Sequence, residues 1–313
     1  MNSFLTVAQQ VIILFILIGV GVLTQKTKLL SEKSVQGLTN LVLYCVTPCL
    51  IIRSFAEIPF SPQKLKELLV ALLLASLIHV GMILLTFPLV RDPDPSRERM
   101  LRFAAMFSNA GFMGLPLQEA LIGADGAFFG GMYIAVFNAF VWSFGLFLMS
   151  GDRKQISPKK MLLTPGLIGV FAGLLVFLMP LLLPSFEIPE IIYAPIRHLA
   201  ALNTPVPMIV VGYYLAQVDF KAALKDYKSF WVLALRMVIF PLLALGILYL
   251  CGLRGNLLIS LIISVSTPVA TMTTMFATKY DRYPEASCNL VSLTTLVSVI
   301  TMPLLVGLAK ILA

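Results

Sequence analysis

Apolar segments of about 20 residues recur along this chain, and short polar stretches separate them. A helix needs about 20 apolar residues to cross the hydrocarbon core of a bilayer. The chain is 59% hydrophobic and only 12% charged, whereas about a quarter of the residues in a soluble domain are charged. We therefore expect an all-α integral membrane protein in the lipid bilayer, with ten transmembrane helices at residues 5–24, 36–56, 66–90, 101–121, 127–150, 163–184, 191–217, 229–251, 256–278 and 286–310.

Lysine and arginine are distributed unevenly among the loops between these segments. The loops after odd-numbered segments hold most of them, including Lys160, Lys221 and Lys225. The other side of the membrane collects few: Arg53, Lys64, Lys66, Arg197, Arg254 and Lys310. Because cytoplasmic loops are enriched in these residues, we predict a multi-pass protein of the cell (inner) membrane with both termini outside the cytoplasm. The net charge of +8 then reflects topology, so we do not expect nucleic acid as a partner.

One apolar segment contains residues that interrupt a helix. Within the stretch Ser108–Glu119 lie Asn109, Gly111, Gly114 and Pro116. Glycine weakens a helix, and proline removes one of its hydrogen bonds. Broken backbone at membrane depth is tolerated only where protein or a water-filled cavity satisfies its polar groups. The break therefore indicates a substrate pathway, because transporters have discontinuous helices at such sites.

Similar interruptions recur in the second half of the chain. Pro268, in the stretch Ser264–Thr271 of the ninth span, corresponds to Pro116 in the fourth span. Pro205 in the seventh span corresponds to Pro48 in the second span. Five spans per half require the second half to insert upside down, which is the inverted repeat of many secondary transporters. The two expected repeats are residues 1–155 and 156–313.

The breaks and their surroundings resemble a known family of carriers. The matching pieces are SNAGFMGLPL at Ser108–Leu117, NTPVP at Asn203–Pro207 with Gly212 behind it, STPVATMTTMFATKY at Ser266–Tyr280, the segment LTTL at Leu293–Leu296, and Met302 with Pro303. On these residues, the chain resembles a bacterial member of the auxin efflux carrier family, which includes the plant PIN carriers and malate or malonate permeases.

The resemblance implies that the fourth and ninth helices are broken and cross at the centre of two inverted five-helix repeats. This fold is shared with bile-acid and sodium–proton carriers. It also implies transport of a small organic anion and a homodimer; Gly126-x-x-x-Gly130 and Gly169-x-x-x-Gly173 are weak packing motifs. The long cytoplasmic loop of many plant members is missing, so the resemblance supports neither plant-type phosphoregulation nor auxin itself as substrate.

The crossing of two broken helices offers a site for a carboxylate. Two half-helix amino termini converge there, with unpaired N–H groups and the positive ends of dipoles, so no lysine or arginine is needed. The amide of Asn109 donates to a carboxylate or caps the broken helix. Gly111, Thr267 and Thr271 also follow the breaks, although the threonine hydroxyls have the alternative of bonding to the preceding turn. Three residues are expected to shape the breaks: Gly114, Pro116 and Pro268.

Polar and proline residues of three other helices are expected to flank this site. Asn138 in the fifth span either bonds between helices or faces the site. The resemblance favours the site, because the fifth helix of the family contributes amide side chains. Thr47 with Pro48 in the second span, and Asn203 with Pro205 in the seventh, either flank the cavity or act as scaffold hinges.

For each of three ionisable residues, the sequence leaves two roles open, and one of them involves charge or proton transfer. Arg236 lies well inside the eighth span and either snorkels to the cytoplasmic interface, which we favour, or attracts anions. His79 either relays protons or, as a lone histidine does more often, makes one hydrogen bond between helices. Glu119 follows the first break and either takes part in proton coupling or faces the outer water.

Neither a cofactor nor a metal site is expected. The cysteines, Cys45, Cys49, Cys251 and Cys288, lack metal-ligand spacing and are expected to be buried, unpaired apolar residues. Both breaks lack the buried carboxylates of sodium–proton antiporters, which disfavours antiport, while sodium or proton coupling stays open. The loop 91–99, RDPDPSRER, is expected to be a solvated linker.

The expected function is secondary transport of a small carboxylate, such as a dicarboxylate or an auxin-like acid, by alternating access. The alternative is a sensor or receptor built on a transporter-like membrane domain, although such proteins usually have a signalling appendage and none is expected here. An enzyme is not expected, because the sequence contains no His-Glu-x-x-His, paired intramembrane aspartates or Gly-x-Ser-x-Gly. We therefore predict no catalytic residues.

Overall fold

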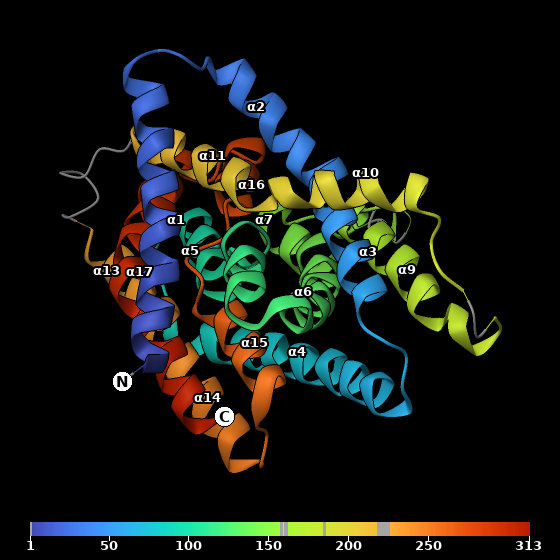
Figure 1. Cartoon of the computed structure of the whole chain (residues 1–313). Helices are drawn as coiled ribbons and strands as arrows, with labels where there is room; N and C mark the ends of the chain where they lie inside the picture. The colour runs from blue at the N-terminus through green and yellow to red at the C-terminus, as the bar shows by residue number, and fades with distance from the viewer. Residues whose placement is uncertain (1, 157–158, 160–161, 184–185, 218–225) are drawn as a thin grey trace.

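The computed structural model describes residues 2–156, 159, 162–183, 186–217 and 226–313. Lys160, Lys221 and Lys225, on which the predicted topology partly depends, lie outside the described residues. Every regular element in the described part is helical (Figure 1). The α-helices are α1 (Asn2–Lys26), α2 (Glu32–Leu41), α3 (Thr47–Glu57), α4 (Pro62–Leu89), α5 (Pro95–Met106), α6 (Leu115–Phe140), α7 (Leu146–Ser150), α9 (Pro165–Leu178), α10 (Glu190–Ala200), α11 (Pro205–Leu215), α13 (Tyr227–Ala234), α14 (Phe240–Leu250), α15 (Gly255–Ser266), α16 (Met272–Lys279) and α17 (Pro284–Leu312).

Short π- and 3-10-helical turns join several of these helices. The turns are η1 (Val42–Val46), η2 (Ala110–Gly114), η3 (Val141–Gly145), η4 (Arg153–Gln155), η5 (Met179–Leu181), η6 (Ala201–Asn203) and η7 (Leu235–Ile239). In α6, the backbone departs from helical geometry at Ile122 and Gly123, where Gly123 has a φ of +60°. The predicted fourth and fifth spans therefore meet at a kink in α6, and glycine tolerates its left-handed conformation.

Several helical runs are long and apolar enough to cross a membrane. Six such runs occur in the described residues: Gln9–Lys26, Glu32–Glu57, Pro62–Leu89, Ala110–Ser150, Tyr227–Leu250 and Pro284–Leu312. Two shorter apolar helical segments are Pro165–Leu181 and Gly255–Ser266. The prediction of an all-α membrane protein is thus confirmed. Ten crossing helices in two inverted repeats stay a prediction, because several predicted spans are divided into pieces too short to cross alone.

Proline marks the points where helices restart after an interruption. The turn η1 leads into α3, which has Pro48 in its first turn, and η6 leads towards α11, which begins at Pro205. Pro116 lies in the first turn of α6 after η2. Proline is tolerated there because the first N–H groups of a helix have no partner within it. The structure therefore has irregular turns at the predicted interruptions of the second, fourth and seventh spans.

Glycines bring α1 and α11 into backbone contact. A Cβ atom added at Gly21 would lie 2.2 Å from the carbonyl oxygen of Ile209, and one at Gly212 would lie 1.9 Å from that of Ile18. Figure 1 shows α1 beside α11 and α17, and α1 packs against both. Any larger side chain at these glycines would force the two helices apart.

A similar contact joins α9 to α3. A Cβ atom at Gly169 would lie 2.8 Å from the Cα atom of Pro48, and one at Gly173 would lie 3.0 Å from the ring of Phe55. The Gly169-x-x-x-Gly173 motif therefore packs two helices of the same chain. Because α10 also packs on α3, the helices α3, α9 and α10 form one group.

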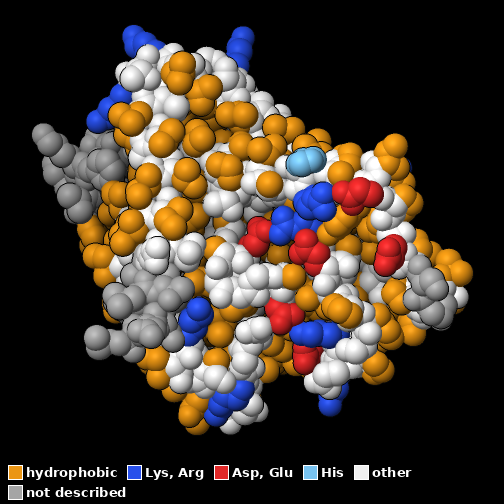
Figure 2. Space-filling model, in the orientation of Figure 1, with side chains coloured by type: hydrophobic (Ala, Val, Ile, Leu, Met, Phe, Trp, Pro, Cys, Tyr) orange, Lys and Arg blue, Asp and Glu red, His pale blue; other side chains and the backbone are white. Residues whose placement is uncertain are grey.

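The surface of the molecule is largely apolar, and hydrophobic side chains cover much of the face in Figure 2. The four cysteines are unpaired, as predicted, but the prediction that they are buried is wrong. Cys45 and Cys251 are exposed, and Cys49 and Cys288 are partly exposed. The physical reason is that the surface of a membrane protein faces hydrocarbon, where a small apolar side chain is as stable as in the core.

The segment 91–99 includes the start of α5, and it is not the solvated linker that its composition predicts. The Asp92 side chain is only 4% exposed, and its Oδ2 forms an ion pair with Lys228 Nζ at 2.8 Å. Arg97 Nη2 lies 2.5 Å from Oδ1 of Asp226, just before α13. The mixed charges of the loop therefore have partners far away in the sequence, which composition alone does not indicate.

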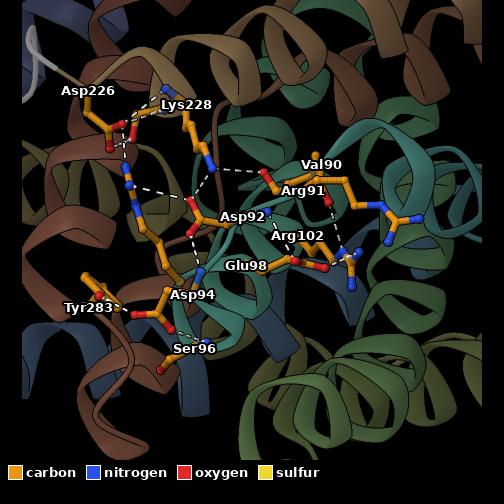
Figure 3. Close-up of polar contacts among 12 residues, drawn as sticks. Val90, Arg91, Asp92, Asp94, Ser96, Glu98, Arg102, Asp226, Lys228 and Tyr283 are labelled. Atoms are coloured by element: carbon orange, nitrogen blue, oxygen red, sulfur yellow. Dashed lines mark hydrogen bonds and ion pairs between the residues drawn. The ribbon is translucent and has the colours of Figure 1, made fainter.

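Two aspartates of this network also cap helices. Asp94 accepts the N–H of Ser96 at 2.7 Å at the start of α5 and also the hydroxyl of Tyr283, which precedes α17 (Figure 3). Asp226 accepts the N–H of Lys228 at 3.1 Å at the start of α13. Carboxylates stabilise helix amino termini in this way. The starts of α5, α13 and α17 are thereby fastened together.

Candidate functional site

Two breaks in the chain meet and pair with each other. The segment after α5 and the segment after α15 run antiparallel, with a β-bridge between Ser108 and Val269. The N–H of Asn109 donates to the carbonyl of Pro268 at 2.8 Å, and the N–H of Ala270 donates to that of Phe107 at 3.0 Å. These bonds satisfy backbone groups that would be costly to leave unpaired at membrane depth. The two interrupted stretches singled out in the sequence thus form one unit.

Asn109 lies at this crossing with an unused amide. The side chain is 5% exposed and does not cap the turn η2 that follows it. Among the described residues, its Nδ2 has no hydrogen-bond partner. Most buried polar atoms in native proteins do have partners. The helix-cap alternative for Asn109 is therefore wrong, and its amide is available for a ligand.

The other predicted ligands after the breaks differ in their contacts. Thr267 is fully buried, and its hydroxyl donates to the carbonyl of Ser264 at 2.9 Å, which is the alternative of bonding to the preceding turn. Thr271 is partly exposed at the N-cap position of α16, without a side-chain cap. A Cβ atom at Gly114 would lie 3.4 Å from Cγ2 of Thr267, whereas one at Gly111 would meet only an Ile134 methyl at 4.0 Å. Gly114 therefore permits the close crossing, and Gly111 borders open space.

Arg236 is completely buried, so the prediction that it snorkels to the interface is wrong. It lies on η7, where Nη2 donates to the carbonyl of Val265 at 2.5 Å and Nε to that of Thr267 at 3.3 Å. These carbonyls lie at the carboxyl end of α15, which carries the negative end of the helix dipole. The guanidinium is held inside because it satisfies orphan carbonyls that no backbone group reaches.

His79 is buried on α4, but among the residues that the structure describes it makes no hydrogen bond between helices. Its Nδ1 lies 2.8 Å from the carbonyl oxygen of Ala75, one turn earlier in the same helix. The ring instead stacks on Phe140 at 5.3 Å between centroids and lies 5.0 Å from the ring of Tyr133. His79 therefore joins α4 to α6 by aromatic packing, since both rings belong to α6.

Glu119 forms an ion pair instead of facing the outer water alone. Its carboxylate pairs with Arg53 of α3, and Arg53 also lies 3.3 Å from Glu57. Acidic and basic side chains gather in one area of the apolar face in Figure 2. The Arg53–Glu119 pair is a polar link between α3 and the first part of α6, just beyond the break.

The predicted flanking residues of the second and seventh spans lie near one another. The turns η1 and η6 are in contact, and α11 contacts η2, the turn that follows Asn109. Asn203 at the end of η6 is fully buried, and in the described part of the chain neither polar atom of its side chain has a partner. Thr47, at the start of α3, is also buried. A second unused amide therefore lies on η6, directly before α11.

Asn138 occupies a different position. Its Nδ2 donates to the carbonyl of Ile134 at 2.9 Å within α6, and a Cβ atom at Gly166 would lie 2.9 Å from the same nitrogen. The amide therefore packs against the start of α9 and bonds within its own helix. A role in the site stays a prediction.

Gln118 is a buried polar residue that the sequence predictions missed. Its Nε2 donates to the carbonyl of Ser260 at 2.8 Å and to Oγ of Ser264 at 2.7 Å, which fastens α6 to α15. Gly126 and Gly130 let the second part of α6 approach Gln118. An added Cβ atom at Gly126 would lie 2.3 Å from the carbonyl oxygen of Gln118, and one at Gly130 would lie 1.8 Å from Oε1 of Gln118. The sequence does carry a signal for this role, because Gln118 is an amide directly after the break in an apolar segment.

Comparisons with known proteins identify the family to which the chain belongs. A family model described as a membrane transport protein matches residues 6–164 and 155–306. An uncharacterized transporter of Methanothermobacter thermautotrophicus is 23% identical over 305 residues, covering 96% of this chain and 98% of the relative. Another, of Methanocaldococcus jannaschii, is 25% identical over 310 residues, covering 94% and 96%. The resemblance found in the sequence is therefore confirmed: this multi-pass membrane protein belongs to the membrane transport protein family of auxin efflux carriers.

Proposed function

We propose that this transporter is a secondary carrier that moves a small organic carboxylate across the membrane by alternating access. The carboxylate is held where the segment α5–η2–α6 crosses α15–α16. The observation that carries the proposal is the buried amide of Asn109, whose Nδ2 has no partner among the described residues. A buried amide without a partner is costly, and a carboxylate oxygen is the acceptor that would satisfy it.

Charge and helix geometry support an anion at this position. The turn η2 and helix α16 both begin beside the crossing, and unpaired N–H groups at helix starts favour negative charge. At the carboxyl end of α15, Arg236 offsets the opposite end of the dipole. Asn203 adds a second buried amide without a partner in the described part of the chain. A carboxylate fits these donors better than a cation or a neutral apolar molecule.

Burial of Asn109 supports a mechanism in which groups of helices move. A substrate reaches a 5% exposed side chain only if the surrounding helices separate. The helices α3, α9 and α10 pack as one group, α1 packs on α11, and the crossing is built from α5, α6, α15 and α16. Movement of the crossing past the first two sets would expose the site to one side and then to the other.

Equivalent positions in the two halves support the inverted repeat. His79 precedes Arg236 by the same 157 residues that separate Pro48 from Pro205. His79 lies beside the C-cap residue of α5, with ring centroids 6.4 Å apart, and Arg236 bonds to the C-cap residue of α15. We therefore retain ten spans in two inverted repeats, with both termini outside the cytoplasm. Protease access to terminal tags in sealed vesicles tests the orientation.

Transport in proteoliposomes tests the function directly. Purified protein is reconstituted, and uptake and efflux of labelled malate, malonate and benzoate are measured against protein-free vesicles. We expect saturable flux of at least one carboxylate and competition by others. If none of them moves or binds, the carrier function is wrong, and ligand binding without flux would favour the sensor alternative.

The driving ion is a separate part of the proposal. Coupling to protons would use His79 or Glu119, while a sodium site would use carbonyl, amide and hydroxyl oxygens. Flux is measured with imposed pH gradients and with sodium replaced by choline. Flux that is constant across the pH gradients removes proton coupling, and flux that is unchanged in choline removes sodium coupling.

A further inference from the structure

Arg236 is the largest fully buried side chain in the described part of the chain. Its nitrogens contact carbonyls of Val265 and Thr267, and Nη1 lies 3.5 Å from Sδ of Met82. Within the described residues, no carboxylate comes within ion-pair distance of it. The guanidinium keeps its charge in a protein interior, because arginine is effectively always protonated in proteins. Its partners in this structure are therefore dipoles and a thioether, none of which has a negative charge.

The carbonyls compensate only part of this charge. The carboxyl end of a helix is equivalent to about half a negative elementary charge. A buried charge without an opposite charge is strongly unfavourable. The interior around the α15 end therefore remains positive when no substrate is bound.

Arg102 shows what a purely structural arginine looks like in the same molecule. Its Nε donates to the carbonyl of Val90 at 3.1 Å and Nη2 to that of Phe87 at 3.2 Å, at the end of α4. It is also mostly buried, but it forms an ion pair with Glu98. Both arginines satisfy carbonyls at a helix end, yet only Arg102 has a carboxylate. The missing carboxylate at Arg236 thus requires its own explanation.

The positive charge and Asn109 hold the same linker peptide. Arg236 donates to the carbonyl of Thr267, and the N–H of Asn109 donates to the next carbonyl along, that of Pro268. We infer that Arg236 is the counter-charge of the substrate, so that the site takes one negative charge and a monocarboxylate makes the crossing electrically neutral. This inference rests on the proposed function. Arg236 acts through the linker peptide as a positioning and charge-balancing residue, without touching the carboxylate.

A consequence for transport follows from where Arg236 lies. The turn η7 packs against α5, α15 and α17, so its charge travels with the crossing. With a monocarboxylate bound, the moving group has no net charge from this pair, whereas the empty group carries one positive charge. A membrane potential therefore acts on the return of the empty carrier and not on the loaded step. One elementary charge crossing the full field changes an equilibrium about tenfold for each 60 mV.

The wild-type protein tests this in proteoliposomes with labelled benzoate and potentials set by potassium and valinomycin. We expect net uptake to change several-fold between opposite potentials of about 60 mV, and benzoate–benzoate exchange to change by less than about 1.5-fold. Equal voltage sensitivity of exchange and net uptake overturns the inference alone. Absence of any benzoate flux or binding overturns the proposed function for this substrate class, and the inference with it.

Variants test the residue itself through the preference for benzoate over its neutral analogue benzamide. We expect Arg236→Gln to lower benzoate affinity about tenfold or more, with benzamide affinity unchanged, and Arg236→Lys to retain most of the preference. Arg102→Gln is the matched control and should keep the full preference. A folded Arg236→Gln protein that still prefers benzoate as strongly as wild type overturns the inference. If that variant does not fold, the wild-type voltage measurement decides.

Discussion

Arg236 and Asn109 donate hydrogen bonds to the carbonyls of two consecutive residues, Thr267 and Pro268. The arginine uses its side chain and the asparagine its backbone. The linker of the second break is therefore held from two sides, by η7 and by the first break. A change at the Arg236 side chain removes a linker contact as well as a charge, whereas a change at the Asn109 side chain leaves its linker contact intact.

Replacing Asn109 with alanine should weaken carboxylate binding without destabilising the protein. The amide Nδ2 has no partner in the described part of the structure, so its removal costs the empty protein no hydrogen bond. In the complex, the variant lacks one hydrogen bond to a charged acceptor, worth about 1.5–3 kcal/mol, or roughly 10- to 100-fold in affinity. Binding of benzoate and malonate by calorimetry, with thermal unfolding of the empty protein in parallel, measures both effects.

Asn256→Ala is the matched control for this change. Asn256 is an exposed amide that donates to Oδ2 of Asp125 at 2.8 Å, on a different part of α15 from the crossing. Its replacement should leave carboxylate affinity within about twofold. Undiminished affinity in Asn109→Ala would remove Asn109 from the site.

Local signals explain why the breaks could be predicted from sequence. Glycine and proline act on the backbone of their own segment, so Pro116 and Pro268 mark interruptions wherever the helices pack. The pairing of the two breaks was expected only through family resemblance, because bonds such as Asn109 to Pro268 join residues that are far apart in the chain.

Partners of charged side chains were the least predictable part. The loop containing Asp92 looks solvated from its composition, yet Lys228 and Arg97 surround that carboxylate. Arg236 was expected to reach the interface because a lone cation in an apolar span usually does so. Its actual partners are main-chain carbonyls exposed by a break in another helix, and the sequence around Arg236 carries no signal for them.

The Arg53–Glu119 ion pair should contribute measurably to the packing of α3 on α6. Both side chains are partly shielded from water, so the pair should be worth about 1 kcal/mol after allowing for screening. A double-mutant cycle of Arg53→Gln and Glu119→Gln, measured by chemical unfolding in detergent, gives this coupling energy. The exposed pair Arg197–Glu190 is the control and should show a coupling near zero. Equal coupling energies for the two pairs would contradict a link between α3 and α6.

Asp226, at the start of α13, should make the stability of the protein depend on pH. Burial raises the pKa of this carboxyl, but hydrogen bonds from Ser229 and Arg97 outweigh burial, so the pKa lies below its ordinary value of 3.8. The stabilisation is therefore fully present well above pH 3.8 and is lost as the pH falls through the lowered pKa.

Comparison of wild type with Asp226→Asn isolates this contribution. The wild type should be more stable by at most about 1 kcal/mol between pH 7 and pH 5, allowing for screening by water, and the difference should shrink as the pH falls below 3.8. Thermal unfolding across this range measures it. Asp152→Asn is the control, since Asp152 caps a short turn and has no ion pair in the described part of the chain. A difference that grows on acidification would show that the Ser229 and Arg97 contacts are not those of an ionised carboxylate.

Close packing of α1 on α11 should make Gly212 intolerant of even one methyl group. A Cβ atom there would lie 1.9 Å from the carbonyl oxygen of Ile18, and main-chain atoms cannot move aside as a flexible side chain can. Gly212→Ala should therefore destabilise the protein by about 1–3 kcal/mol, the usual cost of overpacking. Gly19→Ala lies on the facing helix α1, where an added Cβ meets no atom within 4 Å, so it should be neutral or slightly stabilising through its higher helix propensity. Thermal unfolding of the two variants in the same detergent separates steric contact from helix propensity, and equal stabilities would mean that α1 and α11 do not touch at Gly212.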